Sequence, residues 1–288
     1  MTSPHTFQSV SIPDTEVHPI HSTIVNDDFE LWIARPQAGF IPTPAEPPKV
    51  LFVLDANLCF GTVVETTRLM HKLYGELPPL LVVGIAYPTE DSFLQGRLRN
   101  RDFTPSEDNR FDEMVATFTP PTPVRSVEPA MGGADAFLRF LEEEVKPYVA
   151  ARFEFSQSKT TVFGSSLGGL LVTYASLQRP EMFSHFIAAS PSLWWDNEMM
   201  FEIEPNSAPC GTQLFLTAGD LEESPEIPML AQFKMLTNME RMAERLREKT
   251  LAETLSMEVK SVVLPDETHT SVIPVALTRG LRSCFGRK

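Results

Sequence analysis

Short apolar runs alternate along the chain with longer segments whose apolar residues recur at helical spacing. The short runs are residues 49–54, 80–85, 160–163, 186–189, 213–217 and 257–264. Each is bounded by Gly, Pro, Asp or Asn, and such runs are typical of strands that are buried on both faces of a sheet. We therefore predict that they form one mostly parallel sheet.

Longer amphipathic segments predict helices between these strands. They span residues 134–148, 167–177, 230–249 and about 271–282. Because strands and helices alternate, we expect an α/β fold with a twisted sheet and helices on both of its faces. Residues 22–34 instead favour two antiparallel strands joined at 26–28, which would add an N-terminal edge to the sheet.

The chain has 288 residues, of which 42% are apolar, enough for a substantial core. Its 25 prolines are widely spread and the sequence holds no internal repeat, which favours a single domain over residues 1–288. Residues 104–129 are polar, dotted with proline and without periodicity. A segment of that length after a strand predicts a lid or pocket wall, with a plain surface loop as the alternative.

Acidic residues outnumber basic residues by 38 to 24, which gives a net charge of −14. This charge opposes binding to nucleic acid or to an anionic membrane surface. The sequence has no apolar run of about 18 residues and no secretory signal at its N-terminus, so we expect a cytoplasmic location. Its histidines and cysteines lack metal-ligand spacing, so no metal and no other cofactor is expected. The oligomeric state stays open.

Residues 164–168 read Gly-Ser-Ser-Leu-Gly and match the pattern G-x-S-x-G, with Ser166 at its centre. The pattern lies between a predicted strand and a predicted helix. In that setting it marks a sharp turn that exposes a nucleophilic serine, and small flanking residues leave room for the turn. We predict Ser166 as the nucleophile; a glycine-rich helix start with a capping serine is the alternative.

A serine hydroxyl needs a base to take its proton, and in this fold the chain order is serine, acid, histidine. Of the six histidines, only His269 follows the last predicted strand, in a polar loop before the last predicted helix. His269 is therefore the predicted base, and a solvated loop histidine is the alternative.

A third residue would hold the imidazole in place and stabilise its cation. It is expected after the predicted strand 213–217, where the sequence offers Asp220, Glu222 and Glu223. We favour Glu222, which lies three residues after the strand-terminal glycine. Asp220 and Glu223 remain alternatives.

An oxyanion hole requires backbone N–H donors from two places. Leu167, directly after the nucleophile, is expected to give one donor. The second is expected from the loop after residues 49–54, at Asn57 or Leu58.

Together these residues resemble the putative-esterase family of serine α/β-hydrolases, which includes the enterobactin and salmochelin siderophore esterases. The matching stretches, within about residues 49–283, are LFVLDAN, VVGIAYP, RNRDFTP, GGADAFLRFLEEEVKPYV, VFGSSLGGL, AASPSLWWDN and the terminal ETH. The resemblance implies the α/β-hydrolase fold and a Ser166–His269 pair with an acid on the loop that holds Glu222. Some siderophore esterases of the group are thought to work with little help from an acid, which would make a dyad sufficient.

The chain departs from its relatives at one turn, where they often read Asp-Gly-Asn and this chain has Ala56 in place of the glycine. If that turn required a positive φ, Ala56 would be strained.

The resemblance also implies substrate-binding residues. Trp194 and Trp195 follow the strand after the nucleophile helix and would contact an aromatic or acyl group, or else lie buried under the loop. Arg99 and Arg101 belong to a basic island that would hold an anionic group of the substrate. Their alternative role is pairing with the nearby carboxylates of Asp102, Glu107 and Asp108.

The sequence thus predicts a serine carboxylic ester hydrolase that works through an acyl-enzyme on a small-molecule ester. The expected substrate is a siderophore-type lactone or an aryl or short-acyl ester. An acyltransferase or a thioesterase would use the same residues, and a non-catalytic binding module on this scaffold is a third alternative.

Overall fold

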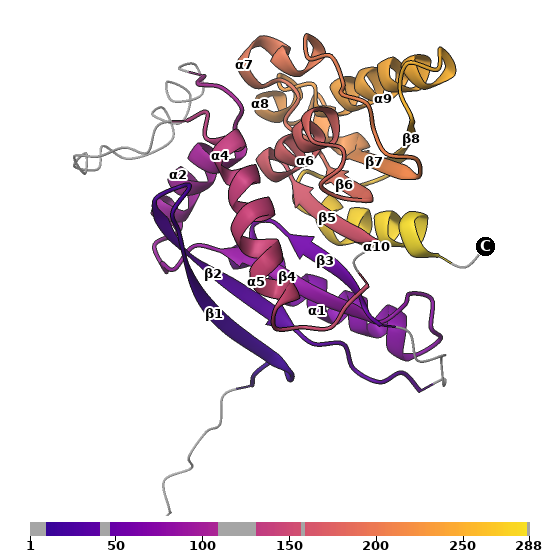
Figure 1. The fold of residues 1–288 in the computed structure, drawn as a ribbon. Helices are drawn as coiled ribbons and strands as arrows, with labels where there is room; N and C mark the ends of the chain where they lie inside the picture. The colour runs from indigo at the N-terminus through magenta and orange to yellow at the C-terminus, as the bar shows by residue number, and fades with distance from the viewer. Residues whose placement is uncertain (1–9, 41–46, 109–130, 157–158, 287–288) are drawn as a thin grey trace, which may run out of the picture.

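An eight-stranded sheet forms the centre of the computed structural model, which describes residues 10–40, 47–108, 131–156 and 159–286. Its strand order is β1-β2-β4-β3-β5-β6-β7-β8 (Figure 1). The strands are β1 (Thr15–Ser22), β2 (Asp27–Ala34), β3 (Lys49–Val53), β4 (Leu80–Ala86), β5 (Thr160–Ser165), β6 (His185–Ala189), β7 (Thr212–Gly219) and β8 (Met257–Leu264). β1 and β2 are antiparallel to their neighbours, whereas β4, β3 and β5 to β8 run parallel. The predicted mostly parallel sheet with an antiparallel N-terminal edge is confirmed.

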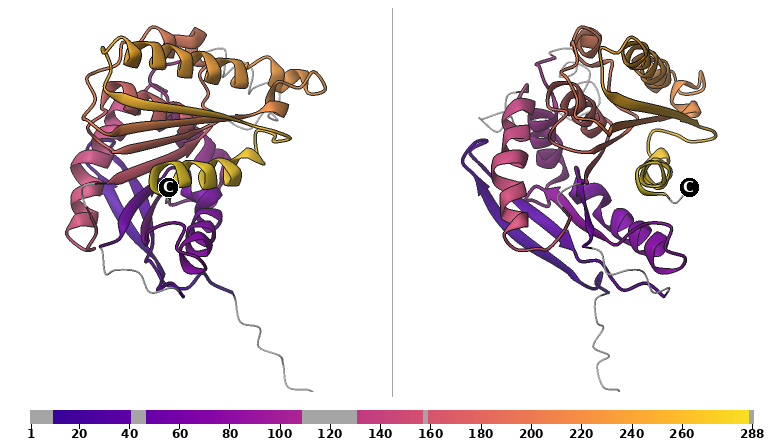
Figure 2. Two further views of the ribbon diagram at one scale, coloured as in Figure 1. Left: turned by 90° about the vertical axis from the view of Figure 1, so that its right-hand side faces the viewer. Right: turned by 45° about the vertical axis from the view of Figure 1, so that its right-hand side comes forward.

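Helices cover both faces of this sheet (Figure 2). One buried cluster joins the sheet to α1 (Ala56–Lys72) and α10 (Val272–Phe285). A second cluster joins its other face to α4 (Ala134–Arg139), η1 (Phe140–Val145), α5 (Lys146–Ala150), α6 (Leu167–Gln178) and α9 (Met235–Leu251). The remaining short elements are α2 (Ser92–Phe103), α7 (Trp195–Glu198), η2 (Met199–Phe201), η3 (Asp220–Glu223) and α8 (Pro228–Ala231).

The N-terminal hairpin differs from its prediction in extent. Its first strand starts at Thr15, and the turn to β2 covers residues 23–26 instead of 26–28. Pro19 lies within β1, where an edge position tolerates a residue that cannot donate a hydrogen bond. That proline breaks the strand pattern in the sequence, and it is the pairing with β2 that makes this segment a strand.

α2 was not predicted, because its arginine-rich sequence shows little amphipathic pattern. It begins at a clear cap: the side chain of Asp91 accepts hydrogen bonds from the N–H groups of Phe93 and Leu94 at 3.0 and 3.2 Å. Near its C-terminal end, Asp102 and Phe103 are buried, so tertiary contacts fix the helix in place.

The proposed lid, residues 104–129, lies outside the described residues from 109 onward. The described beginning of the segment packs against the start of α7. The carbonyl of Ser106 accepts a hydrogen bond from Trp195 Nε1 at 3.2 Å, and Asp108 accepts one from the Asp196 N–H at 2.9 Å.

None of the described helices combines the length and the hydropathy that a bilayer-spanning segment requires.

Candidate active site

Ser166 occupies a strained turn between the end of β5 and the start of α6. Its backbone has φ 60° and ψ −119°, an uncommon conformation for a residue with a side chain. The turn is fixed from β6, because the Ser166 N–H donates to the Ala189 carbonyl at 2.9 Å. The Ser166 carbonyl in turn accepts from the Ser192 N–H at 3.1 Å. A local strain that the surroundings hold in this way is typical of a nucleophile turn.

The two glycines of the pattern are explained by close contacts across this turn. A Cβ atom on Gly164 would lie 2.4 Å from the Gly168 carbonyl oxygen, which leaves no room for a side chain. A Cβ atom on Gly168 would lie 3.3 Å from a carboxylate oxygen of Asp55. The pattern therefore reflects packing between β5, α6 and the loop after β3.

Glu222 and His269 form a hydrogen-bonded pair at the ends of β7 and β8. Glu222 Oε2 lies 2.6 Å from His269 Nδ1. Glu222 Oε1 accepts from Ser190 Oγ at 2.5 Å and from the Gly219 N–H at 2.7 Å. With only 1% of its surface exposed, the glutamate is held by three partners and directed at the imidazole.

The other two candidate acids have partners elsewhere. Asp220 accepts a hydrogen bond from the Asp266 N–H at 2.8 Å. Glu223 accepts from the backbone and side chain of Thr237 at 2.6 and 2.8 Å. Of the three acids, the structure brings Glu222 to His269.

Ser166, Glu222 and His269 face one cavity of about 170 Å³. Its other lining residues are Ser192, Trp194, Leu230, Phe233 and Met235. Ser166 Oγ lies 3.4 Å from Ser192 Oγ and forms no hydrogen bond with His269 in this structure. Bonds of this kind are often long before substrate binds and shorten when it does.

The predicted oxyanion donors lie at the N-terminal ends of two helices. Leu167 is the first residue of α6, and Asn57 lies in the first turn of α1, where backbone N–H groups have no acceptor within the helix. The Leu58 N–H instead donates to the Asp55 carbonyl at 2.9 Å, so the prediction of Leu58 as a donor is corrected. The Asn57 side chain holds the loop to β4 through two hydrogen bonds with the Tyr87 backbone, at 2.8 and 3.0 Å.

Arg99 holds the loop that precedes α1. Its guanidinium donates to both carboxylate oxygens of Asp55, at 2.7 and 2.9 Å, and to the Ser165 carbonyl at 3.2 Å. Asp55 has φ 55°, whereas Ala56 is the first residue of a right-handed helix. The condition for strain at Ala56 is therefore not met, because the turn takes its positive φ one residue earlier, at Asp55.

Arg101 is also bound to carboxylates. It donates to Asp102 at 2.7 and 2.9 Å and to Asp27 at 2.7 Å. Neither Arg99 nor Arg101 lines the cavity. The predicted alternative, pairing with nearby carboxylates, holds for Arg101 and Asp102, whereas Arg99 pairs with Asp55, a carboxylate that was not among the candidates.

Comparison with known proteins gives the family of the chain. The model of the family described as "Putative esterase" matches residues 22–256. This chain belongs to that family. The esterase is 32% identical to the ferri-bacillibactin esterase BesA of Bacillus subtilis over 292 aligned residues, which cover 98% of this chain and 93% of the relative.

Two further relatives support the assignment. The siderophore enterobactin esterase of Emericella nidulans is 33% identical over 254 residues, covering 80% of each chain. The crystal structure of the BES protein from Bacillus cereus is similar with a TM-score of 0.75 and 28% identity, covering 98% of this chain and 100% of that one. The esterase therefore has the α/β-hydrolase fold and is a carboxylic ester hydrolase.

The two tryptophans of the esterase differ in position. Trp194 lines the cavity and packs on Phe233, with ring centroids 4.5 Å apart. Trp195 is fully buried and does not line the cavity; its indole N–H donates to the Ser106 carbonyl. One of the two predicted aromatic residues is thus available to a substrate.

Several residues of the site were missed in the sequence. Ser190 and Ser192 lie in the loop after β6, and their position at the carboxyl end of a parallel strand is a signal that could have marked them. Ser190 has φ 43°, and its hydroxyl holds Glu222. Leu230 lies in α8, Met235 begins α9 and Phe233 lies in the link between these helices. No local pattern distinguishes the three from core residues.

Proposed function

We propose that the esterase hydrolyses small aromatic esters of siderophore type through an acyl-enzyme on Ser166. The observation that carries the proposal is the Glu222–His269 hydrogen bond beside Ser166 in one apolar cavity. A buried carboxylate on Nδ1 leaves Nε2 as the nitrogen that exchanges a proton with the serine.

The reaction follows from these positions. His269 takes the Ser166 proton as Oγ attacks the ester carbonyl, and Glu222 stabilises the imidazolium that forms. The N–H groups of Leu167 and Asn57 bind the oxyanion, aided by the positive ends of two helix dipoles. His269 then protonates the leaving alcohol, and a water molecule activated by the same residue releases the acid from Ser166.

The substrate class is supported by the relatives and by the cavity. Two of the relatives are named for esters of the siderophores bacillibactin and enterobactin. The cavity of about 170 Å³, with Trp194 and Phe233 in its wall, suits a single aromatic ring or a short acyl group. Arg99 and Arg101 are already bound to carboxylates, so an aromatic contact is a better candidate than an ion pair for recognition.

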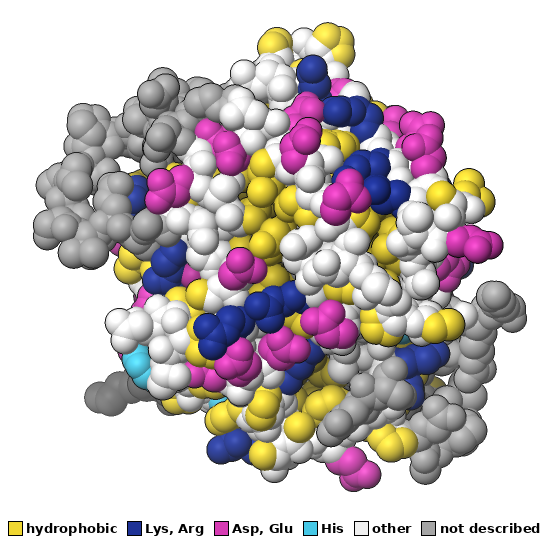
Figure 3. Space-filling view, turned by 45° about the horizontal axis from the view of Figure 1, so that its top comes forward, with side chains coloured by type: hydrophobic (Ala, Val, Ile, Leu, Met, Phe, Trp, Pro, Cys, Tyr) yellow, Lys and Arg dark blue, Asp and Glu magenta, His cyan; other side chains and the backbone are white. Residues whose placement is uncertain are grey.

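A small-molecule ester also fits the molecular surface. The face in Figure 3 mixes acidic and basic side chains around exposed apolar ones and shows no extended basic area of the kind that binds nucleic acid. A cytoplasmic location is part of the same proposal, supported by the free thiols of Cys59, Cys210 and Cys284.

The test is hydrolysis of aryl esters of increasing acyl length beside a catecholate trilactone. We expect turnover of both classes, and Ser166→Ala should lower the rate about a thousandfold or more. Ser165→Ala is a matched control, because that neighbouring hydroxyl is not part of the proposed relay, and it should keep most of the activity. Equal activity in Ser166→Ala and the unmodified protein would contradict the proposal.

A further inference from the structure

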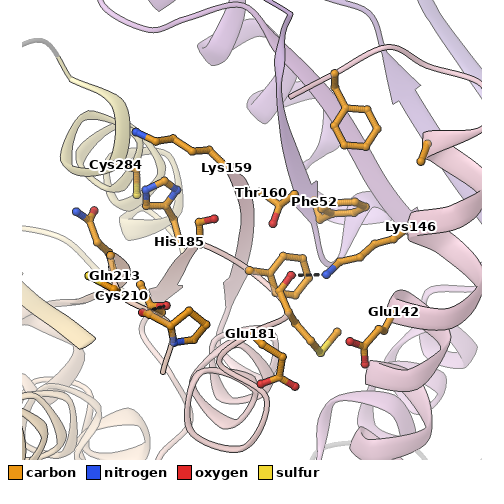
Figure 4. Close-up of a pocket in the computed structure, with 18 of the residues that line it drawn as sticks. Phe52, Glu142, Lys146, Lys159, Thr160, Glu181, His185, Cys210, Gln213 and Cys284 are labelled. Atoms are coloured by element: carbon orange, nitrogen blue, oxygen red, sulfur yellow. Dashed lines mark hydrogen bonds between the residues drawn. The ribbon is translucent and has the colours of Figure 1, made fainter. Parts of the chain in front are cut away.

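A second and larger cavity, of about 780 Å³, lies where the parallel strands begin, at the opposite end of these strands from Ser166 (Figure 4). It is bordered by Thr160, His185 and Thr212, the first residues of β5, β6 and β7, whereas Ser166 follows the last residue of β5. Its volume falls in the range of small-molecule sites. The proposed catalytic residues Ser166, Glu222 and His269 do not line this cavity.

Lys146 extends its amine into this cavity over an aromatic floor. Nζ donates a hydrogen bond to the Met182 carbonyl and lies 4.2 Å from the centre of the Phe183 ring (Figure 4). No carboxylate among the described residues forms an ion pair with it. Glu142, which also lines the cavity, is paired with Arg179 at 3.1 Å.

This position favours the neutral amine. Burial lowers the pKa of Lys146 to about 8, and the nearby charges of Glu142 and Glu181 only partly oppose the effect. The other charged or titratable groups that line the cavity are Lys159, His185, Cys210 and Cys284. Near pH 8 about half of the Lys146 amine is unprotonated, against well under one per cent of an ordinary lysine with a pKa of about 10.4.

We propose that Lys146 is an acylation site that accepts acyl groups from activated donors, such as aryl esters or thioesters, that enter this cavity. The amine nitrogen attacks the donor carbonyl carbon and forms a C–N bond. The C–O or C–S bond then breaks, the leaving group departs with the electron pair, and the proton lost from nitrogen passes to the leaving group or to water. The product is a stable amide, and no oxidant or reductant is needed.

Burial has the opposite effect on a thiol in the same cavity. It raises the pKa of Cys284 to about 12, because burial disfavours the thiolate. A thiol reacts as its anion, whereas an amine reacts in its neutral form. The same loss of solvent therefore suppresses Cys284 and activates Lys146, whereas Cys210, the other thiol of this cavity, is exposed.

The proposal can be tested independently of ester hydrolysis. Ser166→Ala protein is incubated with p-nitrophenyl acetate at pH 8, and acetylated lysines are mapped over time by peptide mass spectrometry. We expect Lys146 to be acetylated at least about tenfold faster than the exposed Lys234, because far more of its amine is neutral. Between pH 9 and pH 7 the rate at Lys146 should fall only about tenfold, against about a hundredfold for an ordinary lysine, so the advantage should grow as the pH is lowered.

Two controls distinguish a specific reaction at Lys146 from the general reactivity of lysines. Lys146→Arg should lose the fast adduct and keep the slow ones, and unfolding the chain in urea should make all lysines react alike. If Lys146→Arg fails to fold, the Ser166→Ala map alone decides. A native protein in which Lys146 reacts no faster than Lys234, or reacts only after unfolding, would overturn the proposal and leave the esterase assignment untouched.

Discussion

The parallel sheet has a carboxyl edge, where its strands end, and an amino edge, where they begin, and each carries a histidine and a cavity. Within the part of the chain that the structure describes, only the histidine of the carboxyl edge is bonded to a carboxylate and lies beside a serine. At the carboxyl edge, His269 keeps 29% of its side chain exposed and bonds to the Glu222 carboxylate. At the amino edge, His185 is 3% exposed, and its Nδ1 lies 3.3 Å from Thr161 Oγ1. Burial, reinforced by Lys159, lowers the pKa of His185 to about 4, so this histidine stays neutral near pH 7.

The difference shows that cavity volume alone does not mark the catalytic edge. The larger cavity offers two thiols, a histidine and two lysines, yet none of them is joined to a carboxylate in a relay. The smaller cavity holds the Glu222–His269 pair beside Ser166. In the proposed reaction, backbone N–H groups at the starts of α1 and α6 bind the developing anion. Chemistry at the carboxyl edge thus depends on hydrogen-bonded partners, and chemistry at the amino edge depends on desolvation.

Replacing the relay carboxylate should have the largest effect. We expect Glu222→Gln to lower kcat about 10³-fold, because the amide no longer stabilises the imidazolium and can favour the wrong tautomer of His269. Steady-state hydrolysis of an aryl ester measures this change. Asp220→Asn and Glu223→Gln are matched controls that remove acids bonded elsewhere and should stay within a few-fold of the parent. Equal losses of kcat in all three variants would contradict the assignment of Glu222 as the acid that supports His269.

The buried histidine of the amino edge should affect stability and not catalysis. Its folded pKa of about 4 lies below the unfolded value of about 6.5. The unfolded chain therefore binds more protons between these values, and the free energy of unfolding falls as the pH drops from 6.5 to 4. For a shift of this size the full loss is roughly 3 kcal/mol.

Urea unfolding at pH 7 and pH 4.5 measures this loss. We expect His185→Gln to lose less stability on acidification than the parent protein. His21→Gln is the control, because His21 is exposed at the opposite side of the sheet order and should leave the acid response unchanged. An unaltered acid response in His185→Gln would show that the histidine is protonated or solvated when folded.

Changing Arg99 tests how far catalysis depends on the geometry of the loop between β3 and α1. We expect Arg99→Lys to lower kcat about tenfold with little change in KM, because lysine cannot hold Asp55 and the Ser165 carbonyl together and the Asn57 N–H would lose its alignment. Labelling of Ser166 by a fluorophosphonate should slow in parallel, since that reaction uses the same oxyanion donors.

Arg101→Lys is the matched control for that experiment. It alters a neighbouring arginine that binds Asp102 and Asp27 but touches neither Asp55 nor Ser165. Thermal unfolding should register this change, whereas kcat should stay within a few-fold. If Arg101→Lys lost as much kcat as Arg99→Lys, general loosening of α2 would explain both.

Local patterns in the sequence were sufficient for most elements of the sheet. Apolar runs located β3 to β7, because a strand buried on both faces must be apolar throughout. The run at 257–264 also located β8, although this edge strand exposes Glu258 and Lys260. Ser166 was found by the same kind of local requirement, since its turn needs Gly164 and Gly168. The limits of β1 and the presence of α2 were missed, because their stability comes from partners far along the chain.

Glu222 and Arg99 show what local sequence patterns do not determine. Three carboxylates stand within residues 220–223, and only the course of η3 decides that Glu222 faces His269. In the sequence the nearest candidate partners of Arg99 are Asp102, Glu107 and Asp108, yet its carboxylate partner lies 44 residues earlier. Such a choice of partner cannot be read from spacing.

The sequence by itself determined the strands β3 to β8, the amphipathic helices between them and the kinds of side chain at their ends. The tertiary structure decided which of those side chains meet, and it turned Arg99 from a substrate-binding candidate into a support for the loop that begins α1. The physical reason is that periodicity and turn chemistry act over a few residues, whereas hydrogen bonds and desolvation depend on distances that strand order alone sets. For that reason, the burial of Lys146 at the amino edge could be recognised only from the folded chain.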